Sequence, residues 1–167
     1  AARMLPSEKE LSLLVPLRKQ LPEEVFTKVF HNPSTDGSGN NRKNLRRAVE
    51  LFKEAGYLMN EGKLTTPSGH QVSLEYLTFS PSFERVIAPF VKNLKRIGIN
   101  ARIRIVDTAQ YSRRMHDFDF DMASVAFASS AIPDIREQAF WGSESAYLPG
   151  STNYAGVSDP VVDILIK

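Results

Sequence analysis

The chain has 167 residues, of which 42% are hydrophobic and 24% are charged. This composition is typical of a folded globular protein and excludes a disordered or fibrous one. A net charge of +2 is too small to favour a nucleic-acid partner, and the absence of cysteine excludes disulfides and thiolate chemistry.

Residues 1–40 are interrupted by prolines at positions 6, 16, 22 and 33, so we expect only short helices there. We predict an irregular, peripheral segment at 1–40 and an α/β ligand-binding lobe at 41–167. The closing stretch DPVVDILIK starts an amphipathic helical pattern that stops after about two turns, which we interpret as a C-terminal truncation of the lobe. A fragment of this kind is not expected to carry the signal peptide of its parent protein.

Three helices are expected after residue 40. Apolar residues recur every three or four positions in 42–55 and in 83–97, which indicates two amphipathic helices. Gly56 and Gly98 follow them and suit the left-handed residue that ends a helix. Asn40 or Asn41 can cap the first helix, and Asp107 can cap a third, short helix at 108–117. Pro89 should kink or locally loosen the second.

Strands are expected between these helices. Segments 71–79 and 99–106 alternate apolar and polar residues, which predicts strands with one covered face. A strand, a helix and a second strand of these lengths imply a right-handed crossover and parallel neighbours. The expected fold class is therefore α/β, with a mixed, mostly parallel sheet flanked by helices. Ligands of such sheets bind beyond the carboxyl ends of the strands, so the loops after Leu77, Val106 and Phe127 are the candidate binding region.

The stretch 117–127, DFDFDMASVAF, sets three carboxylates at alternate positions. A calcium loop starting at Asp117 would need Gly at its sixth position and Glu at its twelfth, where the sequence has Met122 and Ala128. We therefore interpret the stretch as a strand with its two phenylalanines and Met122 on one face. It is expected to continue as a buried apolar run from Ala123 to Ala128.

Other site chemistry finds little support in the sequence. It contains no glycine loop of a nucleotide site, no zinc motif and no GxSxG motif of a serine nucleophile, so we expect no metal and no cofactor. One alternative is a small hydrolase that uses Asp119 or Asp121 with His116. Another is a self-contained protein-interaction domain with an exposed apolar face.

Several segments, taken in order, carry a family resemblance: EAGY at 54–57, NLKRIGI at 93–99, VDTAQY at 106–111, FDFDM at 118–122 and NYAGVSDPVVDILI at 153–166. Together they resemble the family 5 extracellular solute-binding proteins, the oligopeptide-type receptors of ABC importers. A finer pattern is similar to the oligopeptide and microcin C receptors of Gram-negative bacteria. It comprises PSFERVIAPFVKNL at 81–94, FWGS at 140–143 and LPEEVF at 21–26.

The resemblance implies one lobe of a two-lobed clamp, the fold of type II periplasmic binding proteins, and with it half of a binding site. It implies a binding protein without enzymatic activity in the periplasm of a Gram-negative bacterium. The partners that it implies are a peptide or peptide-like ligand, the first lobe of the same receptor and an inner-membrane ABC permease.

The resemblance also implies which residues line the cleft: Phe127, Ala128, Ser129, Ser130, Trp141, Asn153 and Tyr154. Trp141 either stacks on the ligand or packs at the surface of the lobe. Ser130 stands where oligopeptide receptors commonly place an Asp that pairs with the amino terminus of the ligand. A hydroxyl in place of a carboxylate gives up a charge-assisted hydrogen bond. The ligand is therefore expected to be a modified peptide, to carry its amine elsewhere, or to find its acidic partner on the first lobe.

Overall fold

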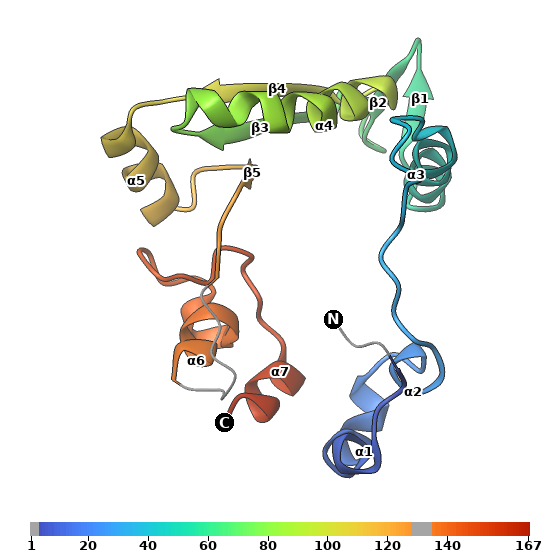
Figure 1. Cartoon of the computed structure of the whole chain (residues 1–167), viewed down its shortest axis with the longest axis vertical. Helices are drawn as coiled ribbons and strands as arrows, with labels where there is room; N and C mark the ends of the chain where they lie inside the picture. The colour runs from blue at the N-terminus through green and yellow to red at the C-terminus, as the bar shows by residue number, and fades with distance from the viewer. Residues whose placement is uncertain (1–3, 128–134) are drawn as a thin grey trace. The chain divides into compact units, whose positions relative to one another are not determined.

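The computed structural model describes residues 4–127 and 135–167 (Figure 1). The chain divides into two compact units. We call residues 35–127 the α/β unit, and residues 1–34 together with 128–167 the terminal unit. The boundary expected at residue 40 lies close to the first border of the α/β unit. The second border, after Phe127, has no counterpart in the expected division.

The α/β unit contains the three helices and the two strands that the periodicity predicts between residues 42 and 117, and a hairpin that it does not. In chain order its elements are α3 (Arg42–Glu54), β1 (Leu58–Asn60), β2 (Lys63–Thr65), β3 (Ser73–Thr78), η2 (Pro81–Phe83), α4 (Glu84–Arg96), β4 (Asn100–Ile105), α5 (Thr108–His116) and β5 (Met122–Ala123). The helix α4 continues through Pro89 as one element. Asp107 caps α5 as expected, because its carboxylate accepts a hydrogen bond from the Gln110 backbone N–H.

A three-stranded parallel sheet forms the centre of this unit, with strand order β4-β3-β5. All six residues of β3 pair with β4, from Ser73 opposite Asn100 to Thr78 opposite Ile105. In Figure 1 the arrowheads of β3 and β4 point toward the end of the sheet where α5 begins. The predicted parallel pairing is confirmed, and the carboxyl ends of the strands lie at one edge.

The core of the unit lies on one face of this sheet, under α3 and α4. Its fully buried residues come from β2, α4, β4 and the turn between them: Leu64, Ile87, Val91, Ile97, Ile99 and Ala101. Leu45, Val49 and Phe52 of α3 pack against this cluster, as do Leu74 and Tyr76 of β3. The helical and strand periodicities read from the sequence therefore converge on the same core.

The antiparallel hairpin of β1 and β2 was not predicted. Its turn uses Glu61 and Gly62, both with positive φ, at 48° and 76°. Leu64 ties the hairpin to the rest of the unit, since its backbone N–H donates to the Gly98 carbonyl at 2.8 Å. Three-residue strands are too short to give a periodic signal.

The stretch 117–127 departs from the expected strand. Only Met122 and Ala123 pair with β3, and Phe118 has a φ of 54°, a left-handed conformation that breaks the alternation of faces. Residues 124–127 are exposed, so the buried run expected from Ala123 is wrong for the part that the structure describes. The reason is that β5 is an edge strand that pairs with β3 for two residues only.

The terminal unit is built from short helices, and those before residue 34 agree with the expectation from the prolines of residues 1–40. They are α1 (Glu8–Leu14), η1 (Val15–Gln20), α2 (Glu24–Thr27), α6 (Arg136–Trp141), η3 (Ser143–Ser145) and α7 (Pro160–Leu165). Ser7 and Glu10 form a capping box at the start of α1, and the Asp159 carboxylate caps α7. Among the residues described in either unit, no helix combines the length and apolar character that crossing a membrane requires.

Candidate functional site

The carboxyl ends of the three parallel strands form the first candidate region. Phe79 directly follows β3, Val106 and Asp107 follow β4, and residues 124–127 follow β5. The Val106 backbone N–H donates to the Thr78 carbonyl at 3.0 Å, which holds the loops after β3 and β4 together. This edge of the sheet is where α/β folds bind ligands, as the sequence predicts.

Aromatic side chains gather at this edge. Phe79 is 48% exposed. Its ring lies edge-to-face on Tyr111 of α5, with 4.9 Å between ring centroids and 61° between planes. Phe127, a predicted ligand residue, is also exposed. Tyr76 of β3 and Ser124 share a hydrogen bond between their hydroxyls. The sequence predicts that the loop after β3 is part of the binding region, but Phe79 was not among the predicted ligand residues. An apolar residue directly after the end of a strand could have indicated it.

Charged side chains, in place of a long backbone ladder, attach the segment before β5 to β3. Arg114 of α5 donates from Nη1 to Glu75 Oε1 at 2.8 Å, and from Nε to Asp119 Oδ2 at 2.8 Å and to the Asp119 carbonyl at 2.9 Å. Asp121 Oδ2 accepts from the Glu75 backbone N–H at 2.8 Å. Arg102 of β4 donates from Nε to Glu75 Oε2 at 3.0 Å. We call these five residues the arginine network; they line a pocket of about 710 Å³.

Glu75 and Arg114 shift each other's pKa within the arginine network. Burial by itself raises the pKa of Glu75, but the hydrogen bonds and positive charges of Arg114 and Arg102 lower it by more, so the net pKa lies below its ordinary value. The hydrogen bond to Glu75 in turn raises the pKa of Arg114. Each partner therefore stabilises the charged form of the other.

The acids of this segment are not arranged as the hydrolase alternative requires. His116 Nδ1 lies 2.8 Å from Asp117 Oδ1, whereas Asp119 bonds to Arg114 and Asp121 to the Glu75 backbone. Within the described ranges, no group of three His, Asp or Glu side chains could hold a metal ion. These carboxylates attach neighbouring elements to one another.

Three predicted ligand residues lie in the terminal unit, around the end of α6. Trp141 is the last residue of α6, and its indole Nε1 donates to Glu137 Oε2 at 3.0 Å. Tyr154 is half-buried. Asn153 is fully buried, and its side chain bonds inward: Nδ2 donates to the carbonyls of Gly142 and Val157, and Oδ1 accepts from the Val157 N–H. Asn153 therefore fixes the shape of the loop that carries Tyr154.

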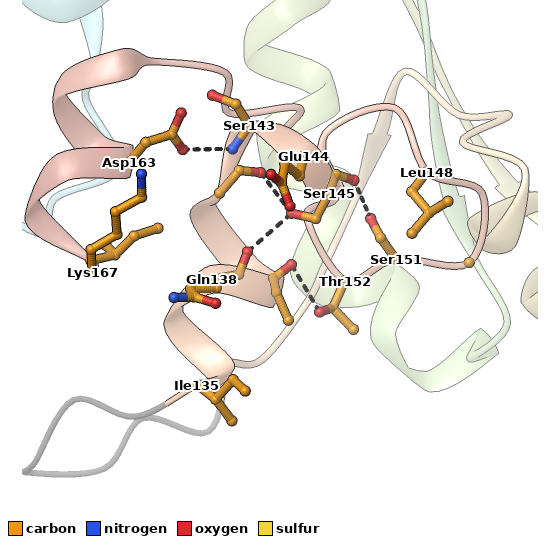
Figure 2. A pocket seen from close by; sticks show the side chains of 14 residues that line it. Ile135, Gln138, Ser143, Glu144, Ser145, Leu148, Ser151, Thr152, Asp163 and Lys167 are labelled. Carbon is orange, nitrogen blue, oxygen red and sulfur yellow. Dashed lines mark hydrogen bonds between the residues drawn. The ribbon is translucent and has the colours of Figure 1, made fainter.

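A pocket of about 720 Å³ opens beside α6 (Figure 2). Several of its polar groups bond to one another. Asp163 of α7 accepts from the Ser143 N–H at 2.8 Å, and Ser151 donates to the Ser145 carbonyl at 2.6 Å. In Figure 2 the Asp163 carboxylate and the Ser143 nitrogen face each other between α7 and η3. The bond from Ser143 also lowers the pKa of Asp163. Trp141, Asn153 and Tyr154 are not among the residues that line this pocket.

The predicted residues Ala128, Ser129 and Ser130 lie outside the described residues. Phe127, immediately before them, leads out of the α/β unit from the edge that carries Phe79 and Ser124.

Comparison with known proteins decides the family. The model of the bacterial extracellular solute-binding proteins, family 5 Middle, matches residues 19–146. The chain belongs to this family.

Relatives of known sequence agree with this assignment. The probable peptide-binding protein YejA of Agrobacterium fabrum is 44% identical over 100% of the chain, which covers 27% of that protein. The peptidoglycan-binding protein YepA of the same organism is 39% identical over 96% of the chain and 26% of its own length. The chain thus spans about a quarter of the length of these family 5 relatives.

A solved structure confirms the fold. A periplasmic oligopeptide-binding protein of an ABC transporter from Thermotoga maritima matches 89% of the chain and 27% of its own length, with a TM-score of 0.65 and 18% identity. The expected family of solute-binding proteins is confirmed, and membership of it argues against the hydrolase alternative.

Proposed function

We propose that the chain is one lobe of a periplasmic receptor for an ABC importer. The receptor captures peptides or peptide-like solutes in a cleft between two lobes. Family 5 membership, together with 44% identity to a protein named as a probable peptide-binding protein, carries this proposal. A relative named as peptidoglycan-binding supports the wider class of peptide-like solutes.

The ligand side of this lobe is proposed to be the carboxyl edge of the sheet and the segment that follows it. Phe127 would contact the ligand together with Ala128, Ser129 and Ser130. Trp141 and Tyr154 would contribute aromatic surface from the terminal unit. Asn153 would act through the loop that it holds, since both ends of its amide already bond within the chain.

Recognition would depend on backbone hydrogen bonds and on few charges. An extended peptide offers an N–H and a C=O at every residue, which lets one receptor accept many side chains. Ser130 carries no charge for a ligand amine. We therefore propose that the amine is modified, or pairs with an acid on the other lobe.

Transport would use closure of the two lobes. A ligand that contacts both lobes favours the closed state because half of its contacts are missing in the open one. The closed receptor would then deliver its ligand to an inner-membrane permease from the periplasm of a Gram-negative cell.

The test is mass spectrometry of the full-length receptor under native conditions, after purification without added ligand. We expect peptide or peptide-like masses to be released when the receptor is denatured. A parallel sample that is unfolded, washed and refolded serves as the control and should release none. Release of sugars or metal chelates in place of peptides would contradict the proposal.

A further inference from the structure

The loop after β3 presents an aromatic side chain to solvent directly after two buried residues. Leu77 and Thr78, the last residues of β3, are buried, yet Phe79 directly after them is 48% exposed. Full burial of a phenylalanine side chain contributes about 1.5–3 kcal/mol, so much of this free energy is unused in the chain as described. The exposed ring can gain it by contacting another apolar group.

The Phe79 ring is held in place before any ligand arrives. Its backbone is fixed by the bond from the Val106 N–H to the Thr78 carbonyl at 3.0 Å and by the bond from the Ser80 N–H to Thr78 Oγ1 at 3.2 Å. The ring itself rests edge-to-face on Tyr111. An aromatic pair of this geometry contributes about 0.5–1.5 kcal/mol beyond its burial. A ring that is already ordered loses little entropy on binding.

The surroundings favour an uncharged contact. The stretch 76–83, YLTFSPSF, contains no charged residue. Its polar groups near the ring are hydroxyls, and those of Ser80 and Ser82 lie 3.0 Å apart and share a hydrogen bond. The nearby carboxylate of Asp107 accepts from the Gln110 N–H. A charged ligand group would lose water here and find no oppositely charged side chain in the stretch 76–83.

The position also points to the ligand. Because β3 is the central strand of the sheet, its carboxyl end lies between those of β4 and β5, and ligands of α/β sheets bind at this edge.

We propose that Phe79 and Tyr111 form a subsite for an apolar or aromatic side chain of the bound peptide. The subsite rests on the proposed function and adds to it a preference of the receptor for peptides with such a side chain. Phe79 is then a specificity-determining residue, with Tyr111 orienting its ring.

The experiment measures peptide affinity by calorimetry in the full-length receptor. The probes are pentaalanine and five pentaalanine peptides that carry Phe at each position in turn. We expect at least one Phe peptide to bind the unmodified receptor about tenfold more tightly than pentaalanine. Phe79→Ala should abolish this preference, so that its Phe peptides bind no more tightly than pentaalanine, whereas Phe79→Leu should retain most of the preference.

The matched control is Phe90→Ala on α4, because Phe90 is also 48% exposed but does not lie at a strand end. It should leave the affinity for every peptide unchanged. A receptor that binds peptides with no Phe preference, or a Phe79→Ala variant that keeps the preference, overturns the subsite alone. Equal weakening of all peptides, with a lower Tm of the free receptor, also overturns it, because it shows that Phe79 packs against the rest of the receptor. Binding of no peptide by the unmodified receptor overturns the proposed function and the subsite together.

Discussion

Replacing Gly98 by alanine is expected to lower the free energy of unfolding by about 3 kcal/mol or more. Gly98 has a φ of 85°, and a Cβ at this position would lie 2.5 Å from the Leu64 backbone nitrogen and 2.9 Å from the Gly62 carbonyl oxygen. Both contacts are with backbone atoms, which a side-chain rotation cannot relieve. The Gly98 carbonyl also accepts the Leu64 N–H, so the added methyl group would push the hairpin away from the bond that holds it.

Gly69→Ala is the matched control for Gly98. Gly69 has almost the same φ, 86°, but a Cβ added there would have no atom of the described residues within 4 Å. It should cost about 1 kcal/mol, which is the backbone penalty of a left-handed alanine alone. Urea unfolding of both variants measures the difference. Equal losses would mean that the close approach of the hairpin to Gly98 does not exist in solution.

Arg114→Ala is expected to lower the free energy of unfolding by about 2 kcal/mol. Arg114 and Glu75 are only 19% and 14% exposed in their side chains, and removal of one member of a buried ion pair costs about 3–5 kcal/mol. The remaining contact with water reduces that cost. The variant also frees Asp119, which Arg114 binds through two bonds. Since β5 pairs over two residues only, the segment before Phe127 should loosen as well.

Arg102→Ala tests the same carboxylate from the exposed side. Arg102 also binds Glu75, but its side chain is 73% exposed, so its loss should cost less than about 1 kcal/mol. Similar losses for Arg114→Ala and Arg102→Ala would contradict the role of burial.

The pH dependence of stability provides a second measurement of the same carboxylate. Because the folded pKa of Glu75 is below its ordinary value, its stabilising contribution is complete above that ordinary value, about 4.3, and is lost as the pH falls through the lower folded pKa. Glu75→Gln should remove the part of the acid destabilisation that comes from this group.

The regular elements of the α/β unit were predictable because each buries one face. In α4 and β4 the apolar period alone places Ile87, Val91 and Ala101 in a common core. The β1–β2 hairpin could not be predicted, since its strands are short and all three residues of its first strand are exposed. The strand predicted at 117–127 was wrong over most of its length. Acids at alternate positions give the same sequence pattern whether they face water on a strand or bind Arg114 and the Glu75 backbone.

The sequence predicted where in the fold the candidate site lies, but it predicted fewer of the residues that form it. Parallel pairing fixes which strand ends meet, so the loops after β3, β4 and β5 could be named in advance. The pairing of Phe79 with Tyr111 depends on how α5 packs, which no local pattern encodes. Asn153 is the opposite case, a predicted ligand residue whose side chain is already used within the chain. From the sequence its amide could bind a peptide backbone, but in the structure it donates to the carbonyls of Gly142 and Val157.

Hydrogen–deuterium exchange of the full-length receptor, with and without the ligand identified by mass spectrometry, tests most directly whether the carboxyl edge of the sheet faces the ligand. We predict slower exchange on binding in residues 78–82 and 124–127, with little change at the opposite edge of the sheet, in residues 70–73 and 98–100. Protection confined to that opposite edge, or absent from both loops, would contradict a ligand site at the carboxyl ends of β3 and β5.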